Sequence, residues 1–456
     1  MHKKTTLLGN TYQFNSLKEI LAKANEERSG DTLAGIGAEN MKERMAAKSI
    51  LADLSLADFR NYPLLPPEED EVSKVIEEGI DGQVYNVIKS WTVAELREFI
   101  LDDAQSGPDL LTISKGLSSE MIAAVTKLMS NLDLIQAASK IEVITRCNTE
   151  IGHKGTLAAR AQPNHPSDSL QGMRASLYEA LSYGAGDAVI GINPVIDTTS
   201  NIHGLLSESK EVMNQFAIPT QNCVLSHVTS QMRAIEKGAP ADLIFQSLAG
   251  TQAGNESFGI SVSLLEEANA LIHQKGTAIG PNRWYFETGQ GSELSSDAHF
   301  GIDQVTLEAR CYGLARKFNP FMLNTVVGFI GPEYLYDSKQ VIRAGLEDHF
   351  MGKLHGLPMG VDVCYTNHMK ADQNDMDNLS MLLASAGVNF VIGVPMADDC
   401  MLNYQSVSYH DIATIRSVLG LKPAAQFEKW LKSQGIMKDG KLTKIAGDPT
   451  LFINRK

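Results

Sequence analysis

Residues able to do chemistry stand at the ends of short apolar segments in the last two thirds of the chain. They supply a permanent cation, Arg160, two carboxylates, Glu287 and Asp362, and several side-chain amides. Carboxylates with amides would suit a small ammonium compound, and an arginine would suit an oxygen beside it. A small polar amino alcohol would therefore fit this set. In chain order the set is Arg160, Gln162, Asn193, His227, Gln246, Glu287, Asn324, Thr325, Asp362, Asp398, Asp399 and Met401.

The same set argues against several other kinds of chemistry. It contains no lysine for a Schiff-base aldolase, and neither a His-paired cysteine nor a GxSxG sequence for a covalent hydrolase. The chain has no HExxH and no His/Cys cluster at zinc-ligand spacing, so we expect no dedicated zinc site and assign no metal ligands. No GxGxxG turn follows a predicted strand, which argues against a doubly wound sheet that binds a dinucleotide.

The elements that must position these residues alternate regularly from about residue 156. Apolar segments typical of strands are separated by amphipathic stretches, a pattern that requires parallel strands with crossover helices. Eight units over about 260 residues predict an α/β fold with a closed (β/α)8 TIM barrel, whose usual length is about 250 residues. The predicted strands are Leu157–Gln162, Ala188–Asn193, Cys223–Val228, Asp242–Gln246, Trp284–Glu287, Met322–Val327, Met359–Cys364 and Asn389–Val394. The predicted helices are Asp168–Leu181, Asn201–Asn214, Ser230–Lys237, Phe258–Gln274, Asp303–Lys317, Lys339–Leu354, Gln373–Ala386 and His410–Leu419.

The carboxyl ends of barrel strands meet at one mouth, where active sites of this fold lie. Any single polar residue at a strand end is equally well explained as a turn or cap residue, but a polar residue on seven consecutive strands favours a site. His227 fits a hydrogen-bonded cap as well as a catalytic role. The stretch Thr288–Ser292 could form a phosphate nest or a loop that needs close backbone approach, and we favour the approach of a bulky cofactor.

Three regions are predicted. Residues 1–150 form a mostly helical N-terminal domain, a helical cap or oligomer surface in which we find no convergent polar cluster. Residues 151–420 form the catalytic barrel, and residues 421–456 form a short helical C-terminal extension. The segment Ile141–Arg146 is ambiguous, because it could be an extra strand or the true first strand of the barrel.

Composition limits the partners and the compartment. The chain has 456 residues, 43% of them hydrophobic, and a net charge of −14, which argues against nucleic acid or an anionic membrane as a partner. Five cysteines without a CxxC pair indicate reduced thiols in the cytoplasm. No apolar segment follows the initial Met-His-Lys-Lys, and no run of about 18 apolar residues occurs, so we expect neither a signal peptide nor a membrane span.

Long stretches of the chain resemble the large subunit of ethanolamine ammonia-lyase, and the resemblance runs from Thr5 to Phe452. The stretches are LAARAQPN (157–164), GDAVIGINP (186–194), YFETGQGS (285–292), NTVVGFIGPEYLY (324–336) and AGLEDHFMGK (344–353). The resemblance implies a barrel with an N-terminal helical domain. It also implies adenosylcobalamin at the barrel mouth, held between this subunit and a separate small subunit.

The resemblance also implies roles for individual residues. Substrate-binding positions would be Arg160, Gln162, Asn193, Glu287 and Asp362, and positions touching adenosylcobalamin would be Pro194, Gln246, Ser295 and Met401. The string Asp297-Ala-His299-Phe-Gly301 is one residue short of a DxHxxG loop, which agrees with a base-on cofactor that keeps its own dimethylbenzimidazole. The stretch Thr251–Ser257 is less similar to the family than its surroundings.

The implied reaction converts ethanolamine to acetaldehyde and ammonia by a radical mechanism. We assign Arg160 to the hydroxyl oxygen, Glu287 and Asp362 mainly to the ammonium group, and Gln162 and Asn193 to orientation. Catalytic roles would fall to Glu287, Arg160 and Asp362. The resemblance further suggests large-subunit dimers in a larger hetero-oligomer, in the cytoplasm or a bacterial microcompartment.

Two alternatives stay open at this point. The first is a lyase or aldolase in which Glu287, Asp362 and His227 bind a divalent metal such as Mg²⁺. The second is a non-catalytic scaffold subunit, although a scaffold would not need the polar set at the strand ends.

Overall fold

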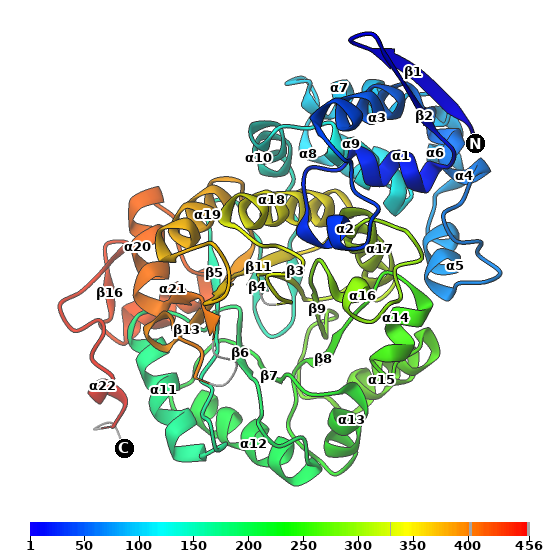
Figure 1. The fold of residues 1–456 in the computed structure, drawn as a ribbon. Helices are drawn as coiled ribbons and strands as arrows, with labels where there is room; N and C mark the ends of the chain where they lie inside the picture. The colour runs from blue at the N-terminus through cyan, green and yellow to red at the C-terminus, as the bar shows by residue number, and fades with distance from the viewer. Residues whose placement is uncertain (329, 401–403, 454–456) are drawn as a thin grey trace.

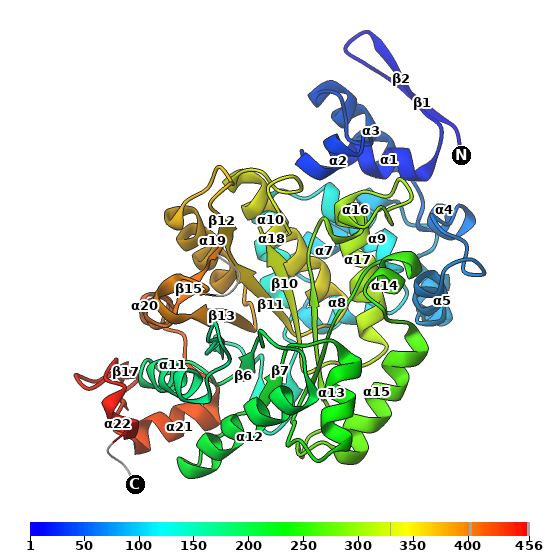
Figure 2. The same cartoon turned by 60° about the horizontal axis from the view of Figure 1, so that its bottom comes forward.

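The computed structural model describes the chain except for residues 329, 401–403 and 454–456. Its centre is a barrel of eight parallel strands, seen from two directions in Figures 1 and 2. Hydrogen-bonded neighbours follow the order β7-β6-β5-β13-β11-β10-β9-β8. The predicted TIM barrel is confirmed, and every predicted strand overlaps an observed one. The strands are β5 (Ala158–Ala161), β6 (Val189–Ile192), β7 (Asn222–Val224), β8 (Ile244–Ser247), β9 (Trp284–Thr288), β10 (Met322–Val327), β11 (Met359–Val363) and β13 (Phe390–Val394).

The barrel is nearly closed, and its seam lies between β7 and β8. In the described chain these two strands meet through individual hydrogen bonds instead of a ladder. Leu243 N donates to Asn222 O at 3.2 Å, and the backbone N–H of Asn222 donates to the Asp242 carboxylate at 3.1 Å. The backbone of Asn222 and the buried carboxylate of Asp242 thus join the two strands where they form no regular ladder.

Crossover helices surround the barrel, with bounds close to those predicted. Several begin at a side chain that accepts a hydrogen bond from the first turn, such as Asp303 and Asp337, which fixes where the helix starts. The helices are α11 (Leu170–Ser182), α12 (Thr199–Gln215), α13 (Val228–Glu236), α15 (Val262–Lys275), α17 (Gln304–Arg316), α18 (Ser338–Leu354), α19 (Gln373–Ser385) and α20 (Tyr409–Leu419). Two short helices, α14 (Gln252–Ser257) and α16 (Ser292–Ser295), follow β8 and β9.

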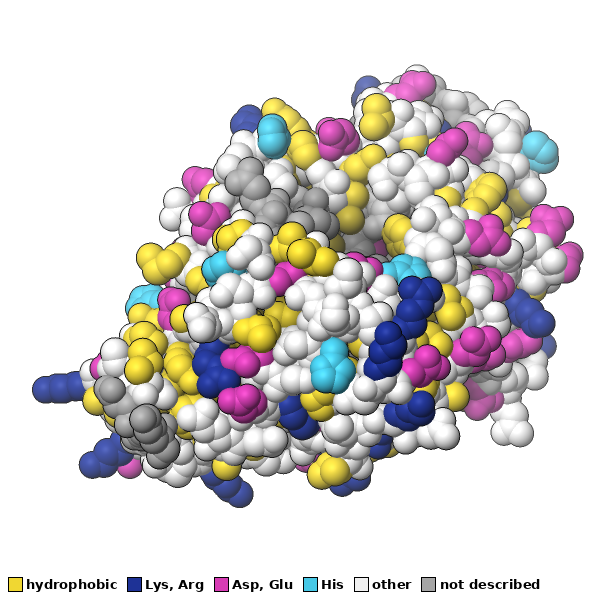
Figure 3. All heavy atoms as spheres, turned by 90° about the horizontal axis from the view of Figure 1, so that it is seen from below, with side chains coloured by type: hydrophobic (Ala, Val, Ile, Leu, Met, Phe, Trp, Pro, Cys, Tyr) yellow, Lys and Arg dark blue, Asp and Glu magenta, His cyan; other side chains and the backbone are white. Residues whose placement is uncertain are grey.

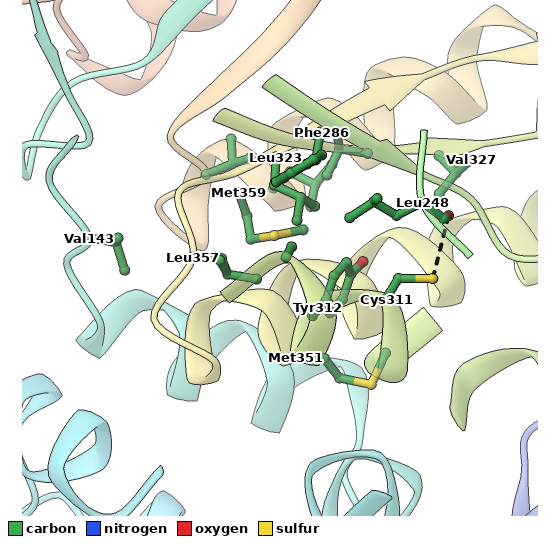
Figure 4. Close-up of a cluster of buried hydrophobic side chains, with 14 of the residues drawn as sticks. Val143, Leu248, Phe286, Cys311, Tyr312, Leu323, Val327, Met351, Leu357 and Met359 are labelled. Carbon is green, nitrogen blue, oxygen red and sulfur yellow. Dashed lines mark hydrogen bonds between the residues drawn. The ribbon is translucent and has the colours of Figure 1, made fainter. Parts of the chain in front are cut away.

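The outer faces of β9 to β11 pack against α17 and α18 in an apolar layer (Figure 4). Phe286, Leu323 and Met359 come from successive strands, and Tyr312 and Met351 come from the two helices. All five side chains are buried. This packing fixes the strands whose opposite faces line the barrel interior.

The ambiguous segment Ile141–Arg146 does not supply a barrel strand. Its last two residues form β3 (Thr145–Arg146), which pairs antiparallel with β4 (Glu150–Ile151). Cys147 and Ile151 belong to a buried apolar cluster with Ala158, at the start of β5. The hairpin therefore covers the end of the barrel opposite the mouth.

The N-terminal residues begin with a hairpin that was not predicted. Strands β1 (Lys3–Leu7) and β2 (Asn10–Phe14) pair antiparallel, and the turn between them places Leu8 and Gly9 at positive φ. The rest of residues 1–150 is mainly helical as far as β3, and several of these helices pack against α17 and α18 on one side of the barrel (Figures 1 and 2). They are α1 (Leu17–Ala24), α2 (Ser29–Leu33), α3 (Met41–Asp53), α4 (Leu56–Asn61), α5 (Glu71–Glu78), α6 (Gly82–Ile88), α7 (Val93–Leu101), α8 (Gly107–Ser114), α9 (Ser119–Lys127) and α10 (Asn131–Lys140).

The C-terminal residues pack beside α11 and α12 (Figure 1). They form α21 (Ala425–Ser433), a hairpin of β16 (Met437–Lys438) and β17 (Lys441–Leu442), and α22 (Thr450–Ile453). The Phe452 ring lies 5.3 Å from Phe216 and 6.2 Å from Trp430, so an aromatic cluster attaches this extension. The proposed domain boundaries at 150 and 420 stay predictions.

The face of the molecule in Figure 3 carries acidic and basic side chains interspersed with hydrophobic ones. The negative net charge is therefore not gathered into one area of this face. Among the described helices, we find none with the length and apolar character needed to cross a lipid bilayer.

Candidate active site at the mouth of the barrel

Arg160 lies at the centre of the predicted site. This side chain on β5 is 1% exposed, and its guanidinium donates to Tyr285 Oη at 2.9 Å and to Asn193 Oδ1 at 2.6 Å. The Glu287 carboxylate lies 4.0 Å away. Gly191 makes room for the arginine, because a methyl group there would overlap Arg160 Nε. Burial opposes the charge, but the facing Tyr285 and Glu287 raise the pKa of Arg160 above its ordinary value.

Glu287, near the carboxyl end of β9, is the carboxylate closest to Arg160. Its Oε1 accepts a hydrogen bond of 2.8 Å from Asn324 Nδ2 on β10, its neighbour in the sheet register. Burial raises the pKa of Glu287, and Arg160 and Asn324 oppose that rise. The side chain keeps 18% of its surface exposed, so a ligand in the mouth can reach it.

Asp362 on β11 supplies the second carboxylate. Its Oδ1 accepts from Ser406 Oγ at 2.9 Å, and its Oδ2 accepts from Tyr404 Oη at 3.2 Å. Burial, together with the negative charge of Glu287, raises the pKa of Asp362 to about 7. Two carboxyl groups whose pKa values are both raised therefore share the site with one fixed cation.

The Asp362→Asn variant should reveal this raised pKa in a stability measurement. Between about pH 4 and 7 the folded chain keeps Asp362 protonated while the unfolded chain ionises it, so the contribution of Asp362 to stability is lost as the pH rises. Relative to the variant, the wild-type free energy of unfolding should fall by up to about 1.4 kcal/mol per pH unit in this window. Urea unfolding from pH 4.5 to 8 measures the difference. A difference that stays constant, or that grows in favour of the wild type with rising pH, would contradict the assignment.

The predicted amides lie beside the charged groups. Asn193 accepts from Arg160, and Gln162 donates to the Asp399 carboxylate, which follows β13. Three buried polar atoms of the site have no hydrogen-bond partner in the described chain: Arg160 Nε, Gln162 Oε1 and Asn324 Oδ1. Unpaired buried polar atoms are costly, so a small polar ligand that bonded to them would remove that cost. All five predicted substrate-binding residues are thus brought together.

An open cavity of about 440 Å³ lies next to this polar cluster, over the ends of β7 to β10. Gln246, one of the four predicted cofactor-binding residues, lines it, and its Oε1 accepts from Val228 N at 2.9 Å. The walls are mainly apolar, with Glu287 at one side. The apolar lining consists of Leu225, Phe245, Leu248, Phe258, Val326 and Ile330.

Of the other three predicted cofactor-binding residues, the structure describes two, Pro194 and Ser295, and neither is a lining residue of this cavity. Pro194 is half-buried directly after Asn193, and exposed Val195 and Ile196 follow it. Ser295 is exposed on α16, where its Oγ donates to the carbonyl of Ser292, a residue of the cavity wall. Met401 lies outside the described residues. The apolar walls fit the apolar face of a corrin ring, and the polar edge of the cavity fits the amide groups on its rim.

His227 caps a helix. Its Nδ1 accepts from Thr229 at the start of α13, and its Nε2 donates to the carbonyl of Phe258 at 2.9 Å. Both ring nitrogens are therefore used within the protein, and His227 does not join Glu287 and Asp362 as a ligand set. Among the described residues, no group of three or more His, Cys, Asp or Glu side chains is arranged to hold a metal ion.

The glycine-rich stretch after β9 is packed against the chain itself. A methyl group on Gly289 would overlap Val326, and one on Gly291, whose φ is +104°, would overlap the ring of Tyr334. The close approach at these two glycines is thus to the protein's own side chains. Thr288 and Ser292 of the same stretch line the cavity, and the approach of a cofactor to this stretch stays a prediction. Thr251–Ser257 forms the cap and body of α14, which Gln252 N ties to the Asp70 carboxylate at 2.7 Å.

Sequence reasoning missed three site residues. Tyr285, which accepts from Arg160, lies two residues before Glu287 and so shares its face of β9; strand alternation could have revealed it. Tyr404 and Ser406, which hold Asp362, come from the segment after β13 that folds back through β14 (Tyr404–Gln405) and β15 (Val407–Ser408). Nothing in the local sequence indicates that return.

Fold and site together define a barrel enzyme whose active site is built from residues at the strand carboxyl ends. The chain matches the ethanolamine ammonia lyase large subunit family over residues 12–445. It is 54% identical to the ethanolamine ammonia-lyase large subunits of Escherichia coli K12 and of Salmonella typhimurium LT2, over 99% of this chain and 100% of each relative. The chain belongs to this lyase family.

Among solved structures, a truncated 3-deoxy-D-arabino-heptulosonate 7-phosphate synthase from Thermotoga maritima matches with a TM-score of 0.38 and 13% identity. The match covers 62% of this chain and 95% of that chain, and it is too weak to bear on function.

Proposed function

We propose that this chain is the catalytic large subunit of an ethanolamine ammonia-lyase. Together with a small subunit it would convert ethanolamine to acetaldehyde and ammonia. The observation that carries the proposal is the convergence of Arg160, Glu287 and Asp362 with the unpaired buried atoms of Gln162 and Asn324. This set offers a cation for a hydroxyl oxygen, carboxylates for an ammonium group, and amides that fix the orientation of both.

Adenosylcobalamin in its base-on form is the proposed cofactor. Gln246, Pro194 and Ser295 would hold it over the apolar cavity, with Met401 as a further contact predicted from the resemblance. When bound, it would supply the radical that removes a hydrogen atom from the carbinol carbon. The residues of this chain would bind and orient the substrate and would exclude water from the site.

Arg160 would bind the substrate hydroxyl, since a fixed cation stabilises negative charge that develops on that oxygen. Asp362 and Glu287 would bind the ammonium group. Oε1 of Glu287 already accepts from Asn324, so we assign Oε2 to accept and return a proton as the amino group migrates. Gln162 and Asn193 would set the angle of the substrate within the mouth.

We extend the proposal to the assembly by similarity to the family. The partner would be the small subunit, the large subunits would pair as dimers in a larger hetero-oligomer, and the complex would work in the cytoplasm or a bacterial microcompartment. We propose neither nucleic acid nor a membrane as a partner.

The test uses this chain co-purified with its small subunit, in dim light. Acetaldehyde is followed through alcohol dehydrogenase and NADH after adding adenosylcobalamin and ethanolamine. We expect turnover that requires both additions. Absorbance that shows bound cofactor without turnover would reject ethanolamine as the substrate, and the absence of both binding and turnover would reject the whole proposal.

A further inference from the structure

A buried polar cluster lies directly behind the site, on the outer face of β9. Side chains alternate along a strand, so Glu287 faces into the barrel and Thr288 faces outward to α17. Thr288 Oγ1 donates to the carboxyl of Glu308, which is 1% exposed. Burial and the nearby Asp348 raise the pKa of Glu308 well above its ordinary value.

The cluster continues to the next strand and to the loop after β9. Asp348 on α18 accepts from Thr325 Oγ1 at 2.9 Å and from Gln290 Nε2 at 2.7 Å. Thr325 is the register partner of Thr288 on the neighbouring strand. The end of β9, the end of β10 and the loop that follows β9 are therefore fixed to the same two helices, within a few residues of Glu287.

The last member of the cluster comes from the N-terminal region. Arg28, between α1 and α2, is 1% exposed, and its Nε donates to Gln290 Oε1 at 3.2 Å. Its Nη2 forms an ion pair with Glu347, which Arg343 also binds at 2.6 Å. The segment around Arg28 is held in place as well, because Gly30 N donates to Tyr334 O at 3.2 Å. The Gln290 side chain thus bridges the Arg28 guanidinium and the Asp348 carboxylate.

We infer that Arg28 is a positioning residue for Glu287 and acts on it through Gln290. The inference rests on the proposed function for its kinetic readout. A core that only had to be stable could fill this space with apolar side chains at less cost than a buried set of carboxyls, amides and arginines. A fully paired polar network, by contrast, specifies one arrangement of the strand end. Misplacing a catalytic group by about 1 Å can cost about 100-fold in rate.

Two variants separate positioning from stability. Arg28→Lys keeps a positive charge opposite Glu347, but an ammonium cannot bind Glu347 and Gln290 in the fixed geometry of a guanidinium. Gln290→Met removes the amide that joins Arg28 to Asp348. In the complex with the small subunit, each variant should lower kcat for ethanolamine by about 10-fold to about 100-fold. KM should change little, because Arg160 and Asp362 still bind the substrate.

The double variant is the decisive measurement. If Arg28 acts through Gln290, Arg28→Lys combined with Gln290→Met should lose no more kcat than the more damaging single change. The control is Ser119→Ala, which removes a buried hydrogen bond of 3.0 Å between the N-terminal region and His355, just after α18. The control should lower thermal stability and leave kcat unchanged.

Hydrogen exchange keeps this test separate from the proposed function. Arg28→Lys should speed exchange of residues 286–295, and Ser119→Ala should not. Losses of kcat that multiply in the double variant, unchanged exchange in Arg28→Lys, or an equal loss of kcat in Ser119→Ala would each overturn the inference. If the wild type shows no ethanolamine turnover, the proposed function fails, and exchange alone decides whether Arg28 orders this loop.

Discussion

The Glu287→Gln variant should lose about 100-fold or more in kcat for ethanolamine, about 2.7 kcal/mol of transition-state stabilisation, while keeping its fold. Glutamine has nearly the same shape as glutamate, and its Oε1 can still accept from Asn324 Nδ2, which lies 2.8 Å from Glu287 Oε1 in the wild type. The negative charge 4.0 Å from Arg160 is lost, and so is the oxygen that accepts and returns a proton. An effect on turnover with an intact fold would therefore report on chemistry.

Steady-state kinetics of the complex with its small subunit measure this change. Glu179→Gln is a matched control, because burial also raises the pKa of Glu179, but this residue lies on α11, outside the barrel interior. The control should retain wild-type kcat. Near-normal turnover in Glu287→Gln would remove Glu287 from the catalytic role assigned to it.

The Arg160→Lys variant should lose about 100-fold in kcat/KM even though it keeps the charge. The guanidinium donates at once to Tyr285 at 2.9 Å, to Asn193 at 2.6 Å and to the carbonyl of Gly191 at 3.4 Å. Lysine cannot reproduce this planar fork, and the buried acceptors it leaves unpaired would cost about 1–3 kcal/mol of folding free energy. We expect a lower melting temperature together with the kinetic loss.

Arg416→Lys serves as the control for Arg160→Lys. The guanidinium of Arg416 is also buried, and it donates to the carbonyls of Leu157 and Gly184 and to the Asp187 carboxylate. Arg416 lies at the start of β5, away from the mouth of the barrel. Its replacement should lower the melting temperature to a similar extent and leave kcat/KM unchanged. If both arginine variants lost kcat/KM alike, the effect at Arg160 would be one of stability rather than of substrate binding.

The barrel could be predicted because its signals are local and repeated. Each strand is a short apolar segment that ends in a polar residue, and each helix shows apolar residues at helical spacing. The five predicted substrate-binding residues could be grouped for the same reason, since the carboxyl ends of the strands meet at one mouth regardless of the conformation of the loops. Their roles in binding and catalysis stay predictions.

Other features depend on distant partners and could not be predicted. The pairing of Asp362 with Tyr404 and Ser406 requires a segment that returns over the mouth more than forty positions later in the chain. The hairpin that begins the chain was missed because its strands are short and polar, and because Leu8, one of its two turn residues at positive φ, is not a usual turn residue. Arg28 was passed over because one arginine between two helices has no periodicity that marks it as buried.

The contacts of Arg28 also constrain the order in which the chain can mature. Arg28 pairs with Glu347, which lies 319 positions later, and with Gln290, which lies 262 positions later. During synthesis the N-terminal helices emerge first and must wait for most of the barrel before this arginine finds its partners. The loop that carries Gln290 therefore gains its last contacts only when the segment around Arg28 meets α18. A ribosome-bound chain that stops short of α18 would hold Glu287 without the contacts that position it.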